Sequence, residues 1–141
     1  MNSKYSRYIT GILIMVLVFV IAIRMQSSSS VSIDFNDDQI VITGPETTEP
    51  ISIAYQAIQS VTLLDHYTIG EKLSGIENRR LSYGTFKNDE YGIYSLCAVP
   101  SIASVIEIRT DHNVILFNYE SEKVTAALSS SMADFVREKQ N

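Results

Sequence analysis

Two histidines, each preceded by an aspartate, are the residues of this sequence whose types best suit proton transfer. They stand in the pairs Asp65-His66 and Asp111-His112. Imidazole titrates near neutral pH and can act as a general base or ligate a metal. Two histidines with neighbouring carboxylates are too few to specify a metal site. Because Asp111 also favours the bend of a turn, a solvated turn is the favoured interpretation there, and His66 is the stronger functional candidate.

No side chain is placed for covalent catalysis. The only cysteine, Cys97, lies in an apolar stretch, which favours a packed, inert thiol over a reactive one. No serine stands in a Gly-x-Ser-x-Gly motif, and Gly70 and Gly75 lack the Lys and Ser/Thr of a phosphate-binding loop. The sequence therefore predicts a protein that is not an enzyme and needs no metal or cofactor. A small hydrolytic enzyme using His66 or His112 is the remote alternative.

A basic cluster is the best candidate for a ligand site. Lys72, Arg79 and Arg80 lie in the long polar stretch 66–80, and Tyr83 follows closely. Arginine pairs bind phosphate or carboxylate groups through bidentate hydrogen bonds. We therefore name Lys72, Arg79, Arg80 and Tyr83 as the candidate ligand-binding residues.

The same stretch also has a structural interpretation, which the sequence favours. Glu71 and Glu77 partly neutralise the basic side chains, as is typical of a solvated loop. Tyrosine is enriched in interfaces, but half-buried strands also use it routinely. The sequence therefore favours a place in half-buried strands for the four tyrosines around the stretch, which are Tyr67, Tyr83, Tyr91 and Tyr94.

Charge divides the chain into two unlike parts. The 141 residues carry a net charge of −5. The first 25 residues contain three basic residues and no acidic one, whereas the remainder contains 8 basic and 16 acidic residues, a net charge of −8. An acidic domain is repelled by nucleic acid and by anionic lipid surfaces. Nucleic-acid binding is therefore not expected.

An apolar run at residues 8–25 predicts a transmembrane helix. No charged residue interrupts it between Ile9 and Ile23, and as a helix it would be about 27 Å long, close to the roughly 30 Å of a bilayer core. Tyr8 and Arg24 suit the two interfaces. A cleaved signal peptide is the rival interpretation, although Arg24 fits its small-residue cleavage site poorly. A buried core helix is the other alternative.

Flanking charges predict the orientation of this segment. Lys4, Arg7 and the terminal amine precede it, whereas Arg24, serines and aspartates follow it. Because basic residues favour the cytoplasmic side, we expect a short basic tail at residues 1–7 inside the cell. The chain then crosses the cell membrane once, and the domain is extracellular.

Beyond a Ser-rich linker at 26–30, apolar and polar residues alternate, which predicts β-strands. Turns rich in Asn, Asp, Gly and Pro separate them, while residues 66–80 are expected to form a long loop. We expect seven antiparallel strands, at about 31–35, 39–43, 60–64, 81–86, 91–99, 104–110 and 114–119.

The C-terminal segment changes to helical spacing. The pattern predicts an amphipathic helix at about 120–138, with Asn118 or Ser121 as its N-cap. One domain at 31–139 is therefore expected, in which curled strands form a barrel or sandwich and the helix covers one open end. The predicted apolar face of the helix comprises Val124, Ala127, Leu128, Met132, Phe135 and Val136.

The strands and helix carry motifs in a recognisable order. "GTF" at 84–86 precedes a turn and Gly92, "TD" at 110–111 ends the next strand, and "FN" at 117–118 precedes the helix. This order resembles that of the bacterial PH-like (pleckstrin-homology-like) domain, which commonly follows one or two membrane helices. The resemblance extends over roughly residues 31–136 and is firmest at 80–128.

This resemblance implies a fold and a class of function. It implies a seven-stranded, curled antiparallel barrel closed by a C-terminal helix, and it implies no catalytic activity. Many members have an Arg shortly before a Gly in the long loop, whereas here Gly75 precedes Arg79 and Arg80. Function must therefore come from a site rather than from the fold.

The combined prediction is a single-pass membrane protein that displays a PH-like domain. We expect a non-catalytic binding or assembly module for a protein or cell-envelope partner, because the sequence contains no recognisable set of catalytic residues. The alternative is a module that binds an anionic ligand or lipid headgroup through Arg79 and Arg80. The acidic character of the domain opposes binding to an anionic lipid surface.

Overall fold

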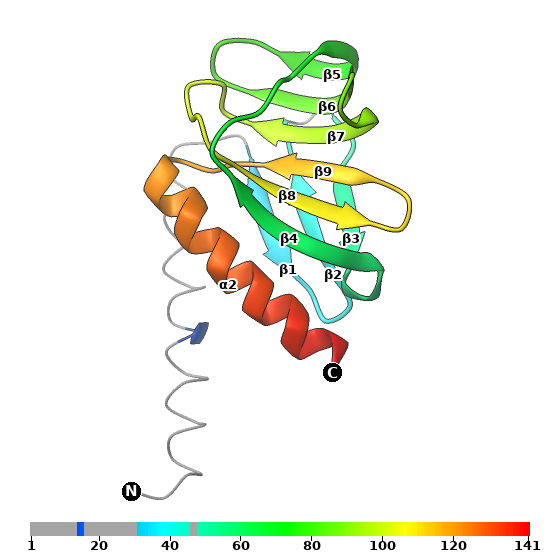
Figure 1. Cartoon of the computed structure of the whole chain (residues 1–141), viewed down its shortest axis with the longest axis vertical. Helices are drawn as coiled ribbons and strands as arrows, with labels where there is room; N and C mark the ends of the chain where they lie inside the picture. Colours follow the sequence, from blue (N-terminus) through cyan, green and yellow to red (C-terminus); the bar gives the residue numbers. More distant parts are fainter. Residues whose placement is uncertain (1–13, 16–30, 46–47) are drawn as a thin grey trace, which may run out of the picture.

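The computed structural model describes residues 14–15, 31–45 and 48–141 (Figure 1). The predicted basic tail, most of the predicted membrane helix at 8–25 and the linker at 26–30 lie outside the described residues. Within the described ranges, no helix is both long and apolar enough to cross a bilayer.

The described part of the domain is mainly β, with one long α-helix at its C-terminus (Figure 1). This confirms the predicted mainly β fold with a C-terminal helix. The elements in chain order are β1 (Ser32–Phe35), β2 (Gln39–Thr43), β3 (Ile51–Ala54), the 3₁₀ helix η1 (Tyr55–Ala57), β4 (Ile58–Leu64), β5 (Glu71–Glu77), β6 (Ser82–Asn88), β7 (Gly92–Ala98), β8 (Val105–Thr110), β9 (Val114–Phe117) and α2 (Glu122–Gln140).

The strands form two open sheets, so the predicted closed, seven-stranded barrel is wrong. One sheet has the order β1-β2-β3, and the other has the order β4-β8-β9-β7-β6-β5. All neighbouring strands are antiparallel except β7 and β9, which are parallel. No closure occurs because β4 and β5, which are consecutive in the chain, are the two unpaired edges of the six-stranded sheet.

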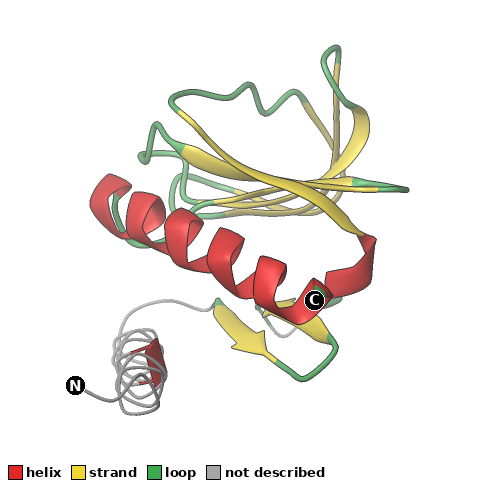
Figure 2. Ribbon diagram, turned by 60° about the horizontal axis from the view of Figure 1, so that its bottom comes forward, coloured by secondary structure: helices red, strands yellow, loops and turns green. Residues whose placement is uncertain are grey.

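The connection between these edges covers one face of the six-stranded sheet. Only residues 65–70 join β4 to β5, and a connection this short favours the curved sheet that Figure 2 shows. The hydroxyl of Tyr94 donates a hydrogen bond to the carbonyl of Ile69. Asn88 Nδ2 donates to the carbonyl of Thr68 at 2.8 Å. These bonds hold the connection against β6 and β7.

The strand β5 occupies part of the stretch that the sequence predicts to be a loop. Its side chains are exposed except for Ile76, which is partly buried. The strand is defined by its pairing with β6, from Glu71 opposite Lys87 to Glu77 opposite Ser82. Since backbone pairing and not burial holds it, β5 lacks the alternating pattern that reveals a half-buried strand.

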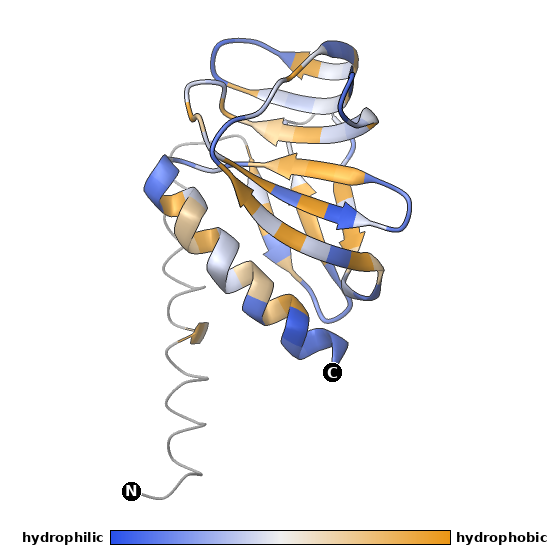
Figure 3. Cartoon of the chain, viewed as in Figure 1, coloured by the Kyte–Doolittle hydropathy of each residue, from blue (hydrophilic) through white to orange (hydrophobic). Residues whose placement is uncertain are grey.

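Buried side chains form two clusters, one on each face of the six-stranded sheet. In β9, Ile115 and Phe117 belong to the first cluster and Leu116 to the second. The first cluster also contains residues of the three-stranded sheet and of α2, and the second lies beneath the 65–70 connection. Figure 3 accordingly shows β9 as hydrophobic along its whole length, as expected for a strand buried on both faces.

The helix α2 runs along the six-stranded sheet and also reaches the three-stranded one (Figure 2). Ser121 is its N-cap, as predicted, because Ser121 Oγ accepts a hydrogen bond from the amide of Val124 at 3.1 Å. The ring of Phe135 lies 5.4 Å from that of Phe35 on β1.

The buried face of α2 differs from the predicted one. Ala127 is exposed, and Thr125 is buried instead because its hydroxyl donates to the carbonyl of Tyr119 at 3.1 Å. A polar residue that is satisfied in this way gives no hydrophobic signal. The buried positions are Thr125, Leu128, Ser129, Met132 and Val136.

Candidate functional site

Arg79 and Arg80 form the tip of the β5–β6 hairpin. The side chain of Asn78 holds the turn, since its Oδ1 accepts hydrogen bonds from the amides of Arg80 at 2.8 Å and Leu81 at 3.0 Å. The amide of Asn78 also donates to the carbonyl of Leu81 at 3.0 Å. Both arginine side chains are exposed. A fixed turn therefore presents the side chains of two consecutive arginines to solvent.

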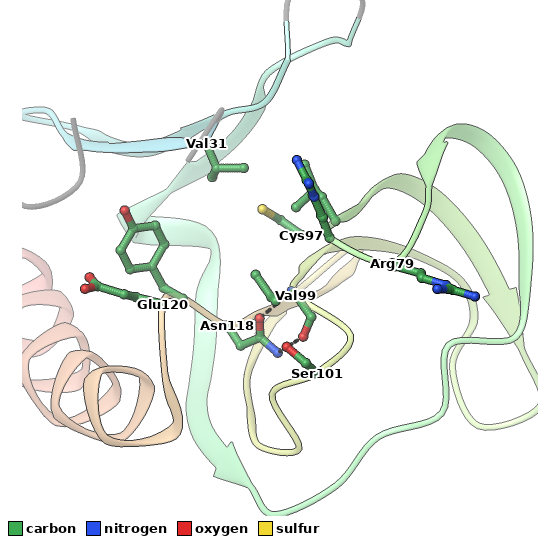
Figure 4. A pocket seen from close by; sticks show the side chains of 10 residues that line it. Val31, Arg79, Cys97, Val99, Ser101, Asn118 and Glu120 are labelled. Atoms are coloured by element: carbon green, nitrogen blue, oxygen red, sulfur yellow. Dashed lines mark hydrogen bonds between the residues drawn. The ribbon is translucent and has the colours of Figure 1, made fainter. Parts of the chain in front are cut away.

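Beside this turn lies a cavity of about 530 Å³ (Figure 4). Its walls come from segments far apart in the sequence: the residue before β1, the β5–β6 turn, the end of β7, the β7–β8 loop and the segment before α2. The polar and charged lining residues are Arg79, Arg80, Ser101, Asn118 and Glu120. The others are Val31, Leu81, Cys97, Val99 and Tyr119.

The charges around the cavity are arranged asymmetrically. Among the described residues, neither Arg79 nor Arg80 forms an ion pair. Among the described residues, Glu120 is the only acidic residue of the lining, and Figure 4 shows it on the opposite side of the cavity from Arg79. Glu120 also has a φ of 58°, a conformation that non-glycine residues adopt uncommonly. Among the described residues, the lining therefore has two arginines without ion-pair partners and one carboxylate, and Figure 4 shows the Arg79 side chain directed outward from the cavity.

The inner wall is fixed by Asn118, which is 2% exposed. Its Oδ1 accepts a hydrogen bond from the amide of Val99 at 2.7 Å. Its Nδ2 lies 3.3 Å from the carbonyl of Ile102 and 3.1 Å from that of Ser104. Asn118 thus ties the β7–β8 loop to the end of β9. This loop carries Ser101, so the shape of the cavity depends on a side chain that is itself buried.

Cys97 lines the cavity without being reactive. The residue is 1% exposed, and burial raises the pKa of its thiol to about 12. A thiol is nucleophilic as a thiolate, so at neutral pH Cys97 contributes an apolar wall. This agrees with the inert, packed thiol that the sequence favours.

Lys72 and Tyr83 lie apart from the cavity. Lys72 pairs with Phe86 at the far end of the hairpin, five residues or about 17 Å along β5 from Glu77. Tyr83 is 1% exposed, and its hydroxyl donates to backbone carbonyls of the three-stranded sheet and the loop that follows β2. The structure therefore brings Arg79 and Arg80 together and separates them from Lys72 and Tyr83.

The two histidines lie on the surface. His66 and His112 are both exposed, and His112 Nε2 lies 3.3 Å from Asp111 Oδ2 in the β8–β9 turn. Within the described part of the chain, no group of three or more His, Cys, Asp or Glu residues could hold a metal ion. The geometry does not unite these residues into a catalytic arrangement.

A second polar cluster, on β8, is fully paired. Tyr91 donates its hydroxyl hydrogen to Glu107 Oε2 at 2.5 Å, and Arg109 Nε donates to Glu107 Oε1 at 2.7 Å. The Arg109 guanidinium also lies 5.4 Å from the centre of the Tyr91 ring. Since both carboxylate oxygens have partners and Glu107 is 7% exposed, this cluster stabilises the sheet and leaves neither oxygen of Glu107 free for a ligand.

Comparison with known proteins gives one match. The family model of the bacterial PH domain matches residues 31–131. No curated protein and no solved structure matches the chain significantly. The match covers most of the chain and nearly all of the domain that the structure describes. The chain therefore belongs to the bacterial PH domain family.

Proposed function

We propose that this protein is a non-catalytic binding module whose cavity beside Arg79 and Arg80 receives a protein or cell-envelope partner. One observation carries the proposal: two arginines without ion-pair partners among the described residues line a preformed cavity with largely apolar walls. Ligand sites commonly combine such walls with a few placed polar groups. The bacterial PH domain is in keeping with a binding or assembly role.

We also propose that the chain is anchored in the cell membrane. Residues 8–25 anchor the chain as a single span, with the N-terminus in the cytoplasm and the domain extracellular, as the flanking charges predict. Val31 lines the cavity and follows the linker at 26–30 directly. Six residues reach about 20 Å at most. An anchored chain therefore presents the cavity close to the membrane surface, where an envelope partner is found.

Photo-cross-linking in cells that express the full chain tests this proposal. A photoreactive phenylalanine at Ser101, an exposed residue of the cavity, is expected to cross-link a discrete partner. The same group at Glu138, an exposed residue of α2, serves as the control. A partner captured only from position 101 supports the proposal. No cross-link from position 101, or the same products from both positions, contradicts it.

The second candidate function is binding of an anionic ligand or lipid headgroup at the same cavity. The unpaired arginines favour it, since guanidinium binds phosphate well. The net charge of −8 beyond residue 25 opposes an extended anionic surface. Calorimetric titration of the full chain, held in uncharged lipid nanodiscs, with inorganic phosphate tests it. Saturable heat that Arg79→Gln with Arg80→Gln removes would favour this candidate, and its absence would eliminate it.

A further inference from the structure

We infer that the ligand of the cavity is the C-terminal end of a partner polypeptide whose last residue is apolar. This inference rests on the proposed function and names the chemistry of the partner. It combines three features of the cavity: the arginine pair, the apolar wall beside it and the acidic residue opposite.

The arginine pair selects a carboxylate or phosphate. Arg79 and Arg80 are consecutive residues of a turn that Asn78 fixes, and the guanidinium group of each presents a planar fork of donors. A fork of this kind binds a carboxylate bidentately and more strongly than a neutral acceptor. Because no acidic side chain in the described residues pairs with either arginine, the ligand need not displace a partner.

The wall beside the arginines requires an apolar group next to the anion. Leu81 directly follows the arginine pair and is 8% exposed, and Cys97 is 1% exposed with a neutral thiol. Val99 completes this side of the cavity. Burying an apolar side chain here is favourable. An inorganic phosphate or a sugar phosphate brings no such group, whereas the last residue of a polypeptide carries its side chain one carbon atom away from the carboxylate.

Glu120 distinguishes a singly charged ligand from a multiply charged one. Its carboxylate is the only acidic group that the described residues contribute to the lining, and it stands opposite Arg79 (Figure 4). It repels a second negative charge, but it can accept hydrogen bonds from the amide N–H groups of a peptide backbone. A cavity of about 530 Å³ is within the usual size of a ligand site and admits the end of a peptide. One charge, one apolar side chain and backbone N–H donors together describe a polypeptide C-terminus.

Fluorescence polarisation tests this inference with the full chain in uncharged lipid nanodiscs. The probes are labelled short peptides that end in valine, leucine or phenylalanine, each made with a free carboxylate and with a C-terminal amide. We expect at least one peptide with a free carboxylate to bind. The amide form of the same peptide is expected to bind at least about tenfold more weakly, because the charge-assisted hydrogen bonds to the carboxylate are lost. Arg79→Gln with Arg80→Gln is expected to weaken the acid by a similar factor.

A matched variant separates the site from net charge. Lys72→Gln with Lys87→Gln removes two exposed cations from the same hairpin, so it changes the net charge equally and is expected to leave the affinity within about twofold. The inference is overturned if no peptide with a free carboxylate binds, or if the acid and amide forms of each peptide bind equally well. It is also overturned if the arginine and lysine double variants lose the same amount of peptide affinity. Tighter binding of inorganic phosphate than of the acid peptides also overturns it.

The outcomes also distinguish this inference from the proposed function. A cross-link from Ser101 that depends on Arg79 and Arg80, together with equal binding of acid and amide peptides, leaves the binding module standing and removes the C-terminal ligand. Absence of both the cross-link and peptide binding removes the two together.

Discussion

The hydroxyl oxygen of Tyr83 on β6 lies 3.0 Å from the carbonyl oxygen of Ile42 on β2. The carbonyl of Glu49 lies 2.7 Å from the same hydroxyl. A single side chain, 1% exposed, thus joins the six-stranded sheet to the three-stranded sheet and its following loop. This contact makes Tyr83 part of the framework that holds the two sheets together, close in sequence to the arginine turn but separate from the cavity.

Tyr83→Phe is therefore expected to lower stability without changing ligand binding. Loss of this hydroxyl removes the one hydrogen that it shares between two backbone carbonyls, which costs about 1–2 kcal/mol in the free energy of unfolding. Urea denaturation followed by circular dichroism measures that change. An unaltered free energy of unfolding, or a loss of peptide affinity in a variant that remains folded, contradicts this assignment.

Gly75 and Gly84 face each other across the β5–β6 hairpin, and neither position has room for a side chain. A Cβ atom at Gly75 would collide with the carbonyl oxygen of Tyr83, and one at Gly84 with that of Ser74. Both residues also have positive φ angles, 106° and 137°. Gly75→Ala and Gly84→Ala are each expected to lower the free energy of unfolding by more than about 3 kcal/mol.

Gly92 provides the matched control for these two glycines. Its φ is also positive, at 69°, but apart from its two chain neighbours no residue has an atom within 4 Å of the position that a Cβ would take. Gly92→Ala is therefore expected to cost only the backbone strain, about 1 kcal/mol. Thermal denaturation of the three variants tests this predicted order of their stabilities. A cost at Gly92 as large as that at Gly75 or Gly84 would show that collision between the strands is not the cause.

The β8–β9 hairpin and the C-terminal helix could be predicted because their apolar residues recur at the spacing of a strand or a helix. The β8–β9 hairpin buries Ile106 and Ile108 on one face, so the alternation along it is visible in the sequence. The helix α2 begins at a serine cap that the sequence also shows. The strand β5 could not be found in this way, because it has only one partly buried side chain.

The cavity could be predicted only in part. The arginine pair stands out in the sequence as a local basic cluster, but Val31, Asn118 and Glu120 join it only through tertiary packing. Asn118 gives no signal beyond its place in the "FN" motif, although it determines the position of the β7–β8 loop. Tyr83 is close to the arginines in the sequence, but its side chain lies on the face of β6 that packs into the core.

High pH is expected to unfold the domain through its buried tyrosines. Burial raises the pKa of Tyr55 to about 12, with Asp38 and Asp37 as further causes, and burial raises that of Tyr94 to about 12. In the unfolded chain both titrate near pH 10. Because the folded pKa values are the higher ones, the stability that these neutral hydroxyls contribute is complete below about pH 10 and is lost between about pH 10 and pH 12.

Tyrosinate absorbance and circular dichroism, recorded together from pH 8 upward, test this expectation. Ionisation of the buried tyrosines is expected to coincide with the loss of β structure above about pH 10. Complete tyrosine ionisation near pH 10 with the circular dichroism unchanged would show that Tyr55 and Tyr94 are accessible in the folded domain.

Protease treatment of intact cells tests the proposed topology with a C-terminal tag after Asn141. An extracellular domain predicts loss of the tag and retention of an N-terminal fragment in the membrane. Permeabilised cells, in which the protease reaches both sides, are the control. Protection of the tagged, membrane-bound chain in intact cells contradicts the orientation. Release of the tagged domain without protease contradicts the retained anchor and indicates a cleaved signal peptide.

Cross-linking from Ser101 in paired charge variants tests the central claim most directly, because it asks whether the arginine cavity is the binding site. One variant is Arg79→Glu with Arg80→Glu, and the other is Lys72→Glu with Lys87→Glu, which changes the net charge equally on the same hairpin. Circular dichroism of both confirms the fold. The account predicts that the arginine variant loses the partner and the lysine variant retains it. Retention in the arginine variant, or equal loss in both, contradicts the account.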